Sequence, residues 1–317
     1  MNYIFNLSKL LIFFMLLNLV YCTNKFTLPP KDGVKCSIDD KSKKYSYTYP
    51  SESKILEMIN DPLLSDFSMK SRVFSIAYNF HQELIKLKTY EKEESNNKSP
   101  SSKYLLQKQL VFQHIHFAQS DISAMESELR CYDDRFSEII RDLKDKEEDI
   151  IREFSLYAIL TSGIGALMDG GSYYIPTINR VVIVLSGILI TYYSYLTIEP
   201  IVDYEYKRKS NVLYDLVHIP DVSDSFSKPI WFLLTQNYSN NEDKKSQIQK
   251  LLDGWNKNGF LGTDEKSKER LKKLYFKEGG KSNIKDTINR KKMIYDTLIL
   301  LDLYQQNIRT FQYEILY

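Results

Sequence analysis

The strongest hydrophobic pattern in the chain is a heptad repeat that covers residues 104–150. Apolar or aromatic residues fill twelve of its fourteen seam positions, which alternate in steps of three and four between mostly charged or polar residues. The seam consists of Tyr104, Lys108, Val111, Ile115, Ala118, Ile122, Met125, Leu129, Tyr132, Phe136, Ile139, Leu143, Lys146 and Ile150. Such spacing, sustained over six heptads, predicts a long helix that supercoils with a partner. An ordinary helical bundle uses the same seam, so both interpretations stay open.

A shorter stripe upstream offers the nearest partner for this helix. Its residues Val73, Ala77, Phe80, Leu84 and Leu87 are spaced four, three, four and three, which places them on one face of a helix. A polar segment over 94–102, with a proline, then breaks the helix and allows it to fold back. We therefore expect an antiparallel, coiled-coil-like helical hairpin over 54–153. The outer part of its long arm needs another partner, either within the chain or in a second copy.

The long helix runs directly into apolar sequence. Residues 154–168 carry no charge, a turn follows at 169–171, and residues 181–198 form a second uncharged run. Between Glu153 and Glu199 only Asp169 and Arg180 are charged. The second run is long enough to span a bilayer, so the pattern predicts an apolar, transmembrane-type helical hairpin over 154–200. A hairpin buried in a soluble domain is the alternative.

Small residues suggest how the two arms of this hairpin pack. Transmembrane helices approach closely where glycine, alanine or serine lies between them. We expect such residues of the first arm to face such residues of the second. The set comprises Ser162, Gly163, Gly165 and Ala166 on the first arm, and Ser186 and Gly187 on the second.

The last part of the chain, 201–317, is predicted to be a small helical domain. A helix over 204–217 is expected to continue out of the apolar hairpin, and short amphipathic helices are expected at 230–236, 248–255 and 271–276. The final helix carries an apolar stripe that has to be buried. This stripe consists of Ile294, Leu298, Leu301, Tyr304, Ile308, Phe311 and Ile315.

The N-terminus carries the pattern of a signal peptide. Lys9 precedes an apolar run over 10–20 that is too short for a spanning helix, which predicts export and a signal peptide over 1–22, cleaved after Cys22. Lipidation of Cys22 is the alternative. Residues 23–53 follow as an extended leader, with a short strand expected at 45–49.

Composition and charge narrow the classes further. With only 11 Gly and 9 Pro in 317 residues, the chain has few helix breakers, which favours an all-α fold. Its net charge of +2 provides no overall attraction to nucleic acid, and no nucleic-acid partner is expected. Once Cys22 is removed or lipidated, Cys36 and Cys131 are the remaining pair. They form either a disulfide or two free thiols, and the sequence leaves both open.

No catalytic motif is recognisable. The chain has four histidines, of which His114 and His116 lie two positions apart on a predicted helix and therefore on different faces. We predict no catalytic, cofactor-binding or metal-binding residue, no cofactor, and no enzymatic activity. Residues 264–292 hold eleven Lys and Arg against five Asp and Glu. Such a run is most simply a solvated helix face, and contact with anionic lipid is the alternative.

These features predict an exported, membrane-associated protein that is anchored in a cell-envelope or secretory-pathway membrane. The lipid bilayer is its expected partner through 154–198. A protein partner or a second copy is expected to bind through the 104–150 seam, which gives the chain a structural or partner-binding role.

The order of elements over 54–220 also resembles that of α-helical pore-forming toxins, although the C-terminal third departs from that layout. This resemblance implies a soluble helical rod that hides an apolar hairpin until it meets a membrane. The charges favour this alternative, because Arg152 and the run Lys207-Arg208-Lys209 flank the hairpin whereas its tip has only Arg180. For an exported body the positive-inside rule prefers the opposite distribution.

Overall fold

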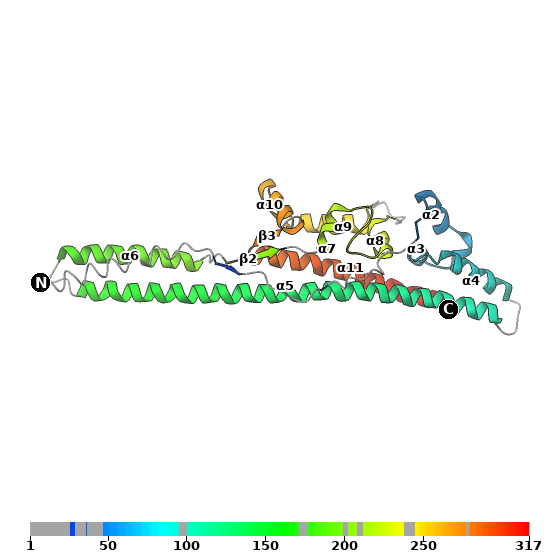
Figure 1. The fold of residues 1–317 in the computed structure, drawn as a ribbon, viewed down its shortest axis with the longest axis horizontal. Helices are drawn as coiled ribbons and strands as arrows, with labels where there is room; N and C mark the ends of the chain where they lie inside the picture. The colour runs from blue at the N-terminus through cyan, green and yellow to red at the C-terminus, as the bar shows by residue number, and fades with distance from the viewer. Residues whose placement is uncertain are drawn as a thin grey trace. The chain divides into compact units, whose positions relative to one another are not determined.

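Helices make up most of the described chain. The computed structural model describes residues 26–28, 36, 47–94, 100–170, 176–198, 202–207, 212–237, 245–276 and 279–316. This part contains ten α-helices, one 3-10 helix and three short strands (Figure 1). The helix-dominated fold confirms the all-α prediction at this level. The predicted signal peptide, with Cys22, lies outside the described residues.

The chain divides into two compact units. One comprises Met1–Lys31, Ser137–Tyr206 and Gly280–Thr287, and the second comprises Asp32–Phe136, Lys207–Gly279 and Ile288–Tyr317. The long helix α5 (Ser102–Gly170) and the final helix α11 (Ile284–Leu316) contribute residues to both units. As predicted, α5 runs without a break from the heptad repeat into the apolar sequence.

The heptad seam is the buried face of α5. Ten of its positions are buried, namely Val111, Ile115, Ala118, Ile122, Met125, Leu129, Phe136, Ile139, Leu143 and Ile150. In the second unit α11 lies along α5 (Figure 1), where Lys291 pairs with Asp133 and Gln305 donates to the Ser123 hydroxyl. Because the α5 numbers fall as the α11 numbers rise, the two helices are antiparallel. Along this part of α5 the seam therefore finds a partner within the chain, in the final helix; supercoiling stays a prediction.

The stripe at 73–87 does not form one helix. Helix α3 (Met69–Ala77) ends at a turn in which Asn79 has a positive φ of 57°, and α4 (His81–Glu94) begins two residues later. Asparagine is one of the few residues that tolerates this left-handed conformation, and the Phe80 N–H closes the turn by donating to the Ser75 carbonyl. The prediction of a continuous helix was wrong, because apolar periodicity persisted across a local turn.

The remaining helices of the second unit are short. They are α2 (Glu52–Ile59), η2 (Pro62–Leu64), α7 (Val212–His218), α8 (Lys228–Thr235), α9 (Gln247–Lys257) and α10 (Glu265–Phe276). The predicted helices near 230–236, 248–255 and 271–276 are thus confirmed. Every residue of the predicted apolar stripe on α11 is buried. Two polar contacts fix neighbouring helices on α11: Trp255 Nε1 donates to Asp296, and the Tyr304 hydroxyl donates to the Leu233 carbonyl.

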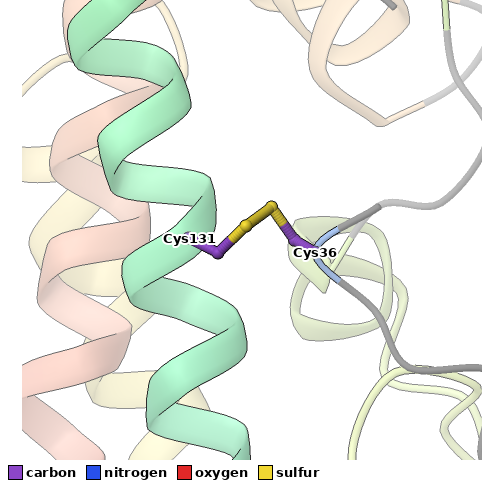
Figure 2. The surroundings of a disulfide bond; sticks show 2 residues. All are labelled: Cys36 and Cys131. Atoms are coloured by element: carbon purple, nitrogen blue, oxygen red, sulfur yellow. A yellow bond between two sulfur atoms is a disulfide. The ribbon is translucent and has the colours of Figure 1, made fainter. Parts of the chain in front are cut away.

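The leader is fastened to the second unit at two places. Cys36 forms a disulfide with Cys131 on α5, across 95 positions of sequence (Figure 2). Farther along, the Tyr47 and Tyr49 hydroxyls both donate to the Ala77 carbonyl, and the Lys228 ammonium donates to the Tyr47 carbonyl. Residues 47–50 have no regular secondary structure, so the predicted strand was wrong for 47–49; residues 45 and 46 lie outside the described residues.

Three short strands appear, and one of them lies in a segment for which a helix was expected. Strands β1 (Phe26–Leu28), β2 (Val202–Lys207) and β3 (Gly279–Ser282) form a sheet in the order β1-β2-β3. Strands β1 and β2 are parallel, with Thr27 opposite Asp203. The predicted helix over 204–217 was wrong for 204–207, which belong to β2, because 202–205 alternate between buried Val202 and Tyr204 and the half-exposed Asp203 and Glu205. It is confirmed for 212–217, which lie in α7. Alternation with a period of two suits a strand.

Candidate functional site

The most distinctive surface of the chain belongs to the apolar hairpin of the first unit. Helix α6 (Pro176–Ile198) lies alongside the C-terminal part of α5 (Figure 1). Each of the two helices contains a stretch that is long and apolar enough to cross a membrane, judged by length and composition. The hairpin is therefore the candidate site, and its inner and outer faces have different properties.

Aromatic rings hold the open end of the hairpin together. Phe154 on α5 stacks on Tyr193 on α6, with ring centroids 6.2 Å apart, and Tyr157 packs against the same ring at 5.7 Å. Moving toward the tip, α6 buries Leu189, Ser186 and Val182, and α5 buries Thr161. The buried α6 positions are spaced four, three and four, so they form one stripe that faces α5.

One pair of small residues, Gly165 on α5 and Ser186 on α6, is in close contact. A Cβ on Gly165 would lie 2.7 Å from the Ser186 Oγ, which leaves no room for a side chain at position 165. At Gly163 and Gly187 a Cβ would meet no atom within 4 Å, and Ser162 and Ala166 are exposed. The predicted small-residue interface thus reduces to Gly165 and Ser186, because the other four residues point away from the partner arm.

Four serine and threonine hydroxyls of the hairpin donate hydrogen bonds within their own helices. Thr161 and Thr191 donate to the carbonyls four residues earlier, and Ser186 and Thr197 donate to the carbonyls three residues earlier. Polar groups in the hydrocarbon of a bilayer need such internal partners, because no water is available there. Any serine or threonine within a helix can bond in this way, so the sequence does not distinguish these hydroxyls from others.

The outer face of the hairpin is apolar and exposed. Ile159 is 68% exposed and Val184 is 62% exposed. Their exposed neighbours are Leu156, Leu160, Leu167, Val181, Ile188 and Ile198. The outward face of a helix in water is normally charged or polar. An exposed apolar surface that extends along both arms instead indicates contact with lipid or with another apolar surface.

Charges lie at the described ends of the hairpin. At the open end Arg152 pairs with Asp149 at 2.7 Å, and Glu153 accepts a hydrogen bond from the Tyr157 hydroxyl. Near the tip Arg180 is exposed. The side chain of Asp169, the other charged residue of this region, lies outside the described residues. The uncharged stretches therefore lie between charged ends, as in spanning helices.

The histidines lie apart from this site. His81 is buried at the start of α4, His114 stacks on Phe80, His116 is exposed, and His218 stacks on Tyr214. Burial lowers the pKa of His114, and the Glu83 carboxylate opposes that shift. In the described ranges no three His, Cys, Asp or Glu side chains come together as metal ligands. The absence of enzymatic activity stays a prediction.

No protein-family model, curated protein or solved structure matches the chain. The geometry of the hairpin and the disulfide between Cys36 and Cys131 are the features that bear on its function.

Proposed function

We propose that this chain is an exported protein anchored in a membrane by the hairpin over 154–198, and that its helical second unit serves as a structural or partner-binding element. The observation that carries the proposal is the apolar outer face of the hairpin, which is exposed along both arms. A bilayer covers such a face. The hydroxyls that donate to carbonyls of their own helices keep these hydrogen bonds when the hairpin leaves water.

The disulfide supports an orientation of the hairpin in which both of its flanks lie outside the cytosol. Two spans return the chain to the side from which it entered, so the sequences before and after the hairpin share one compartment. Cys36 and Cys131 are bonded and both precede the hairpin. Because disulfides persist in oxidising compartments, the bond supports placing both flanks outside the cytosol. The tip around 168–179 then reaches the opposite side.

The second part of the proposal is that a protein partner or a second copy binds to α5 within residues 104–150. Within this range Val111, Ile115 and Leu129 are fully buried in the chain, so a partner has to use other faces of α5. Leu105 and Leu106, near the start of α5, are exposed apolar side chains and suit such a contact. Replacing both by glutamate is expected to abolish cross-linking to a partner or to a second copy. Unchanged cross-linking would assign the contact to another surface.

The decisive experiment is fractionation of expressed protein, followed by a carbonate wash of the membrane pellet. Wild-type protein is expected to stay in the washed membrane. A charge at the centre of a spanning helix costs about 2.5–3.5 kcal/mol, so the double variant Ile159→Glu, Val184→Glu is expected to leave it. The double variant Val222→Glu, Leu303→Glu is the matched control, because Val222 is 73% exposed, Leu303 is 47% exposed, and both lie in the second unit. Wild-type protein in the soluble fraction would contradict the anchor.

The positions of the flanking charges favour a second candidate, an α-helical pore-forming protein. Arg152 and Lys207–Lys209 lie on the flanks, which opposes insertion during export with those flanks outside. A hairpin that enters a membrane later, from outside, is not subject to this rule. Water-soluble protein that releases dye from liposomes would support the pore former, and soluble protein without leakage would contradict both candidates.

A further inference from the structure

His81 lies in the joint between α3 and α4 and is almost completely buried. The residue is 2% exposed, and its Nδ1 lies 2.9 Å from the Ser75 hydroxyl oxygen. The joint has a defined geometry, since Asn79 adopts the left-handed conformation and the Phe80 N–H donates to the Ser75 carbonyl. His81 is therefore a titratable group held inside a tight turn of the second unit.

The hydrogen bonds determine which ring nitrogen carries the proton. The Ser75 hydroxyl donates its single proton to the Arg72 carbonyl, at 2.7 Å. In the contact with His81 the hydroxyl oxygen is then the acceptor, so Nδ1 bears the hydrogen. The other nitrogen, Nε2, is buried and has no hydrogen-bond partner in the part of the chain that the structure describes. Protonation would turn it into a buried donor without an acceptor.

The surroundings also disfavour a positive charge on the ring. Burial lowers the pKa of His81, the Asp61 carboxylate opposes this shift, and the Arg72 guanidinium adds to it. Arg72 is held in place because it donates to the Ile59 carbonyl at 2.6 Å. His81 is the first residue of α4, where the helix dipole also opposes a cation. On α5, the imidazole of His114 interacts with the carboxylate of Glu83 on α4. On α11, the uncharged ring of Phe311 stacks on Phe80.

We propose that His81 is an acid-sensitive switch, which holds the α3–α4 joint closed while neutral and opens it when protonated. Its neighbour Phe80 transmits the change, because that ring stacks on both His114 of α5 and Phe311 of α11. Opening of the joint withdraws Phe80 and exposes the aromatic cluster that it forms with Phe74 and Phe311. The proposal does not depend on whether the hairpin enters a membrane.

The sign of the pH dependence follows from proton linkage. The closed joint binds a proton less readily than an opened one, in which the pKa returns to about 6.5. Above that value both forms are neutral and the joint is fully stable. Below it the opened form gains a proton that the closed form lacks, until the pH falls through the lowered pKa of the closed form. The opening equilibrium is therefore expected to rise by up to about tenfold per pH unit in this window.

Hydrogen exchange of the full-length protein, corrected for intrinsic rates, tests the switch between pH 7.5 and 5.5. Amides of α3 and α4 are expected to exchange faster as the pH falls, and amides of α8 and α9 are expected to keep their protection. His81→Asn retains a donor near the position of Nδ1 but cannot become charged, so its α3–α4 exchange is expected to lose the pH dependence. His116→Asn, at an exposed histidine, is the matched control and is expected to keep it.

Equal pH dependence in wild type and His81→Asn would overturn the proposal, as would wild-type exchange in α3 and α4 that does not change with pH. If His81→Asn fails to fold, nitrogen chemical shifts of the wild-type imidazole give a separate test. They are expected to report the Nδ1–H form at neutral pH and a titration midpoint below 6.5. An Nε2–H form, or a midpoint at or above 6.5, would also refute the switch.

Discussion

Gly165 on α5 lies so close to Ser186 on α6 that a side chain at position 165 would have to displace its neighbour. The added Cβ would be 2.7 Å from the serine Oγ and 3.4 Å from its Cβ, whereas at Gly163 it would meet nothing within 4 Å. The Ser186 hydroxyl is also committed, since it donates to the Ile183 carbonyl. One glycine of the Gly-Ile-Gly sequence thus sets the spacing of the two arms, and the other does not.

Gly165→Val is therefore expected to destabilise the hairpin by about 1–3 kcal/mol, the usual cost of overpacking a close contact. Gly163→Val introduces the same side chain two residues away on the same helix, into open space, and is expected to have little effect. Thermal unfolding of both variants in one detergent measures the difference. Equal losses of stability would show that the contact does not limit helix spacing.

The disulfide between Cys36 and Cys131 is expected to be a major source of stability. It closes a loop of 95 residues, for which chain entropy predicts about 4–5 kcal/mol. Cys131→Ser is expected to lower the free energy of unfolding by that order, and reductant is expected to affect the wild type alone. Cys36→Ser removes the same bond from its other end and is expected to give the same loss of stability. Insensitivity of the wild type to reductant would argue against the bond.

At the contact between α5 and α11, Glu126 is expected to respond to acid in the sense opposite to that of His81. Burial raises the pKa of Glu126, the nearby Asp302 carboxylate raises it further, and Arg130 opposes the shift. Above its raised pKa Glu126 is charged, and the folded state disfavours that charge. Glu126→Gln removes the charge and is therefore expected to increase stability at neutral pH. The gain is expected to stay below about 1 kcal/mol, because Asp302 is 44% exposed and solvent screens the repulsion.

This gain is expected to shrink as the pH falls and to vanish below about 4.3, where Glu126 is protonated in both the folded and unfolded states. Chemical denaturation at several pH values measures it. Glu148→Gln, at an exposed site on the same helix, is expected to be neutral throughout. A gain for Glu126→Gln that persists in acid would rule out the electrostatic cause.

Two glycosylation sequons test the proposed orientation of the hairpin. Asn97-Lys98-Ser99 precedes the hairpin and Asn237-Tyr238-Ser239 follows it. If two spans place both flanks outside the cytosol, expression in a eukaryotic secretory pathway is expected to modify both sites. The gel shift should disappear on enzymatic deglycosylation and fall by one step in Asn97→Gln or Asn237→Gln. Modification of one site alone, with the other sequon accessible, would contradict a two-span hairpin.

Local periodicity was sufficient to predict several elements of this protein. The continuity of α5 and the buried face of α11 could be predicted because each is a long helix whose apolar positions recur with the helical repeat over many turns. Errors arose where the signal was short or interrupted. Three apolar–polar pairs in Val202–Lys207 suit a strand, yet their pairing partner is the distant segment Phe26–Leu28. At Asn79 a single left-handed residue ended a helix that the apolar spacing appeared to continue.

Periodicity shows which face of a helix is buried, but it does not show what buries it. Residue spacing and side-chain hydrophobicity were enough to predict the helical class, the burial of the α5 seam and the apolar character of the hairpin. The folded chain was needed to show that α11 covers part of the seam, that Cys36 reaches Cys131, and that Gly165 rather than Gly163 meets Ser186. Those contacts join residues far apart in the chain, and they depend on how all the elements pack together.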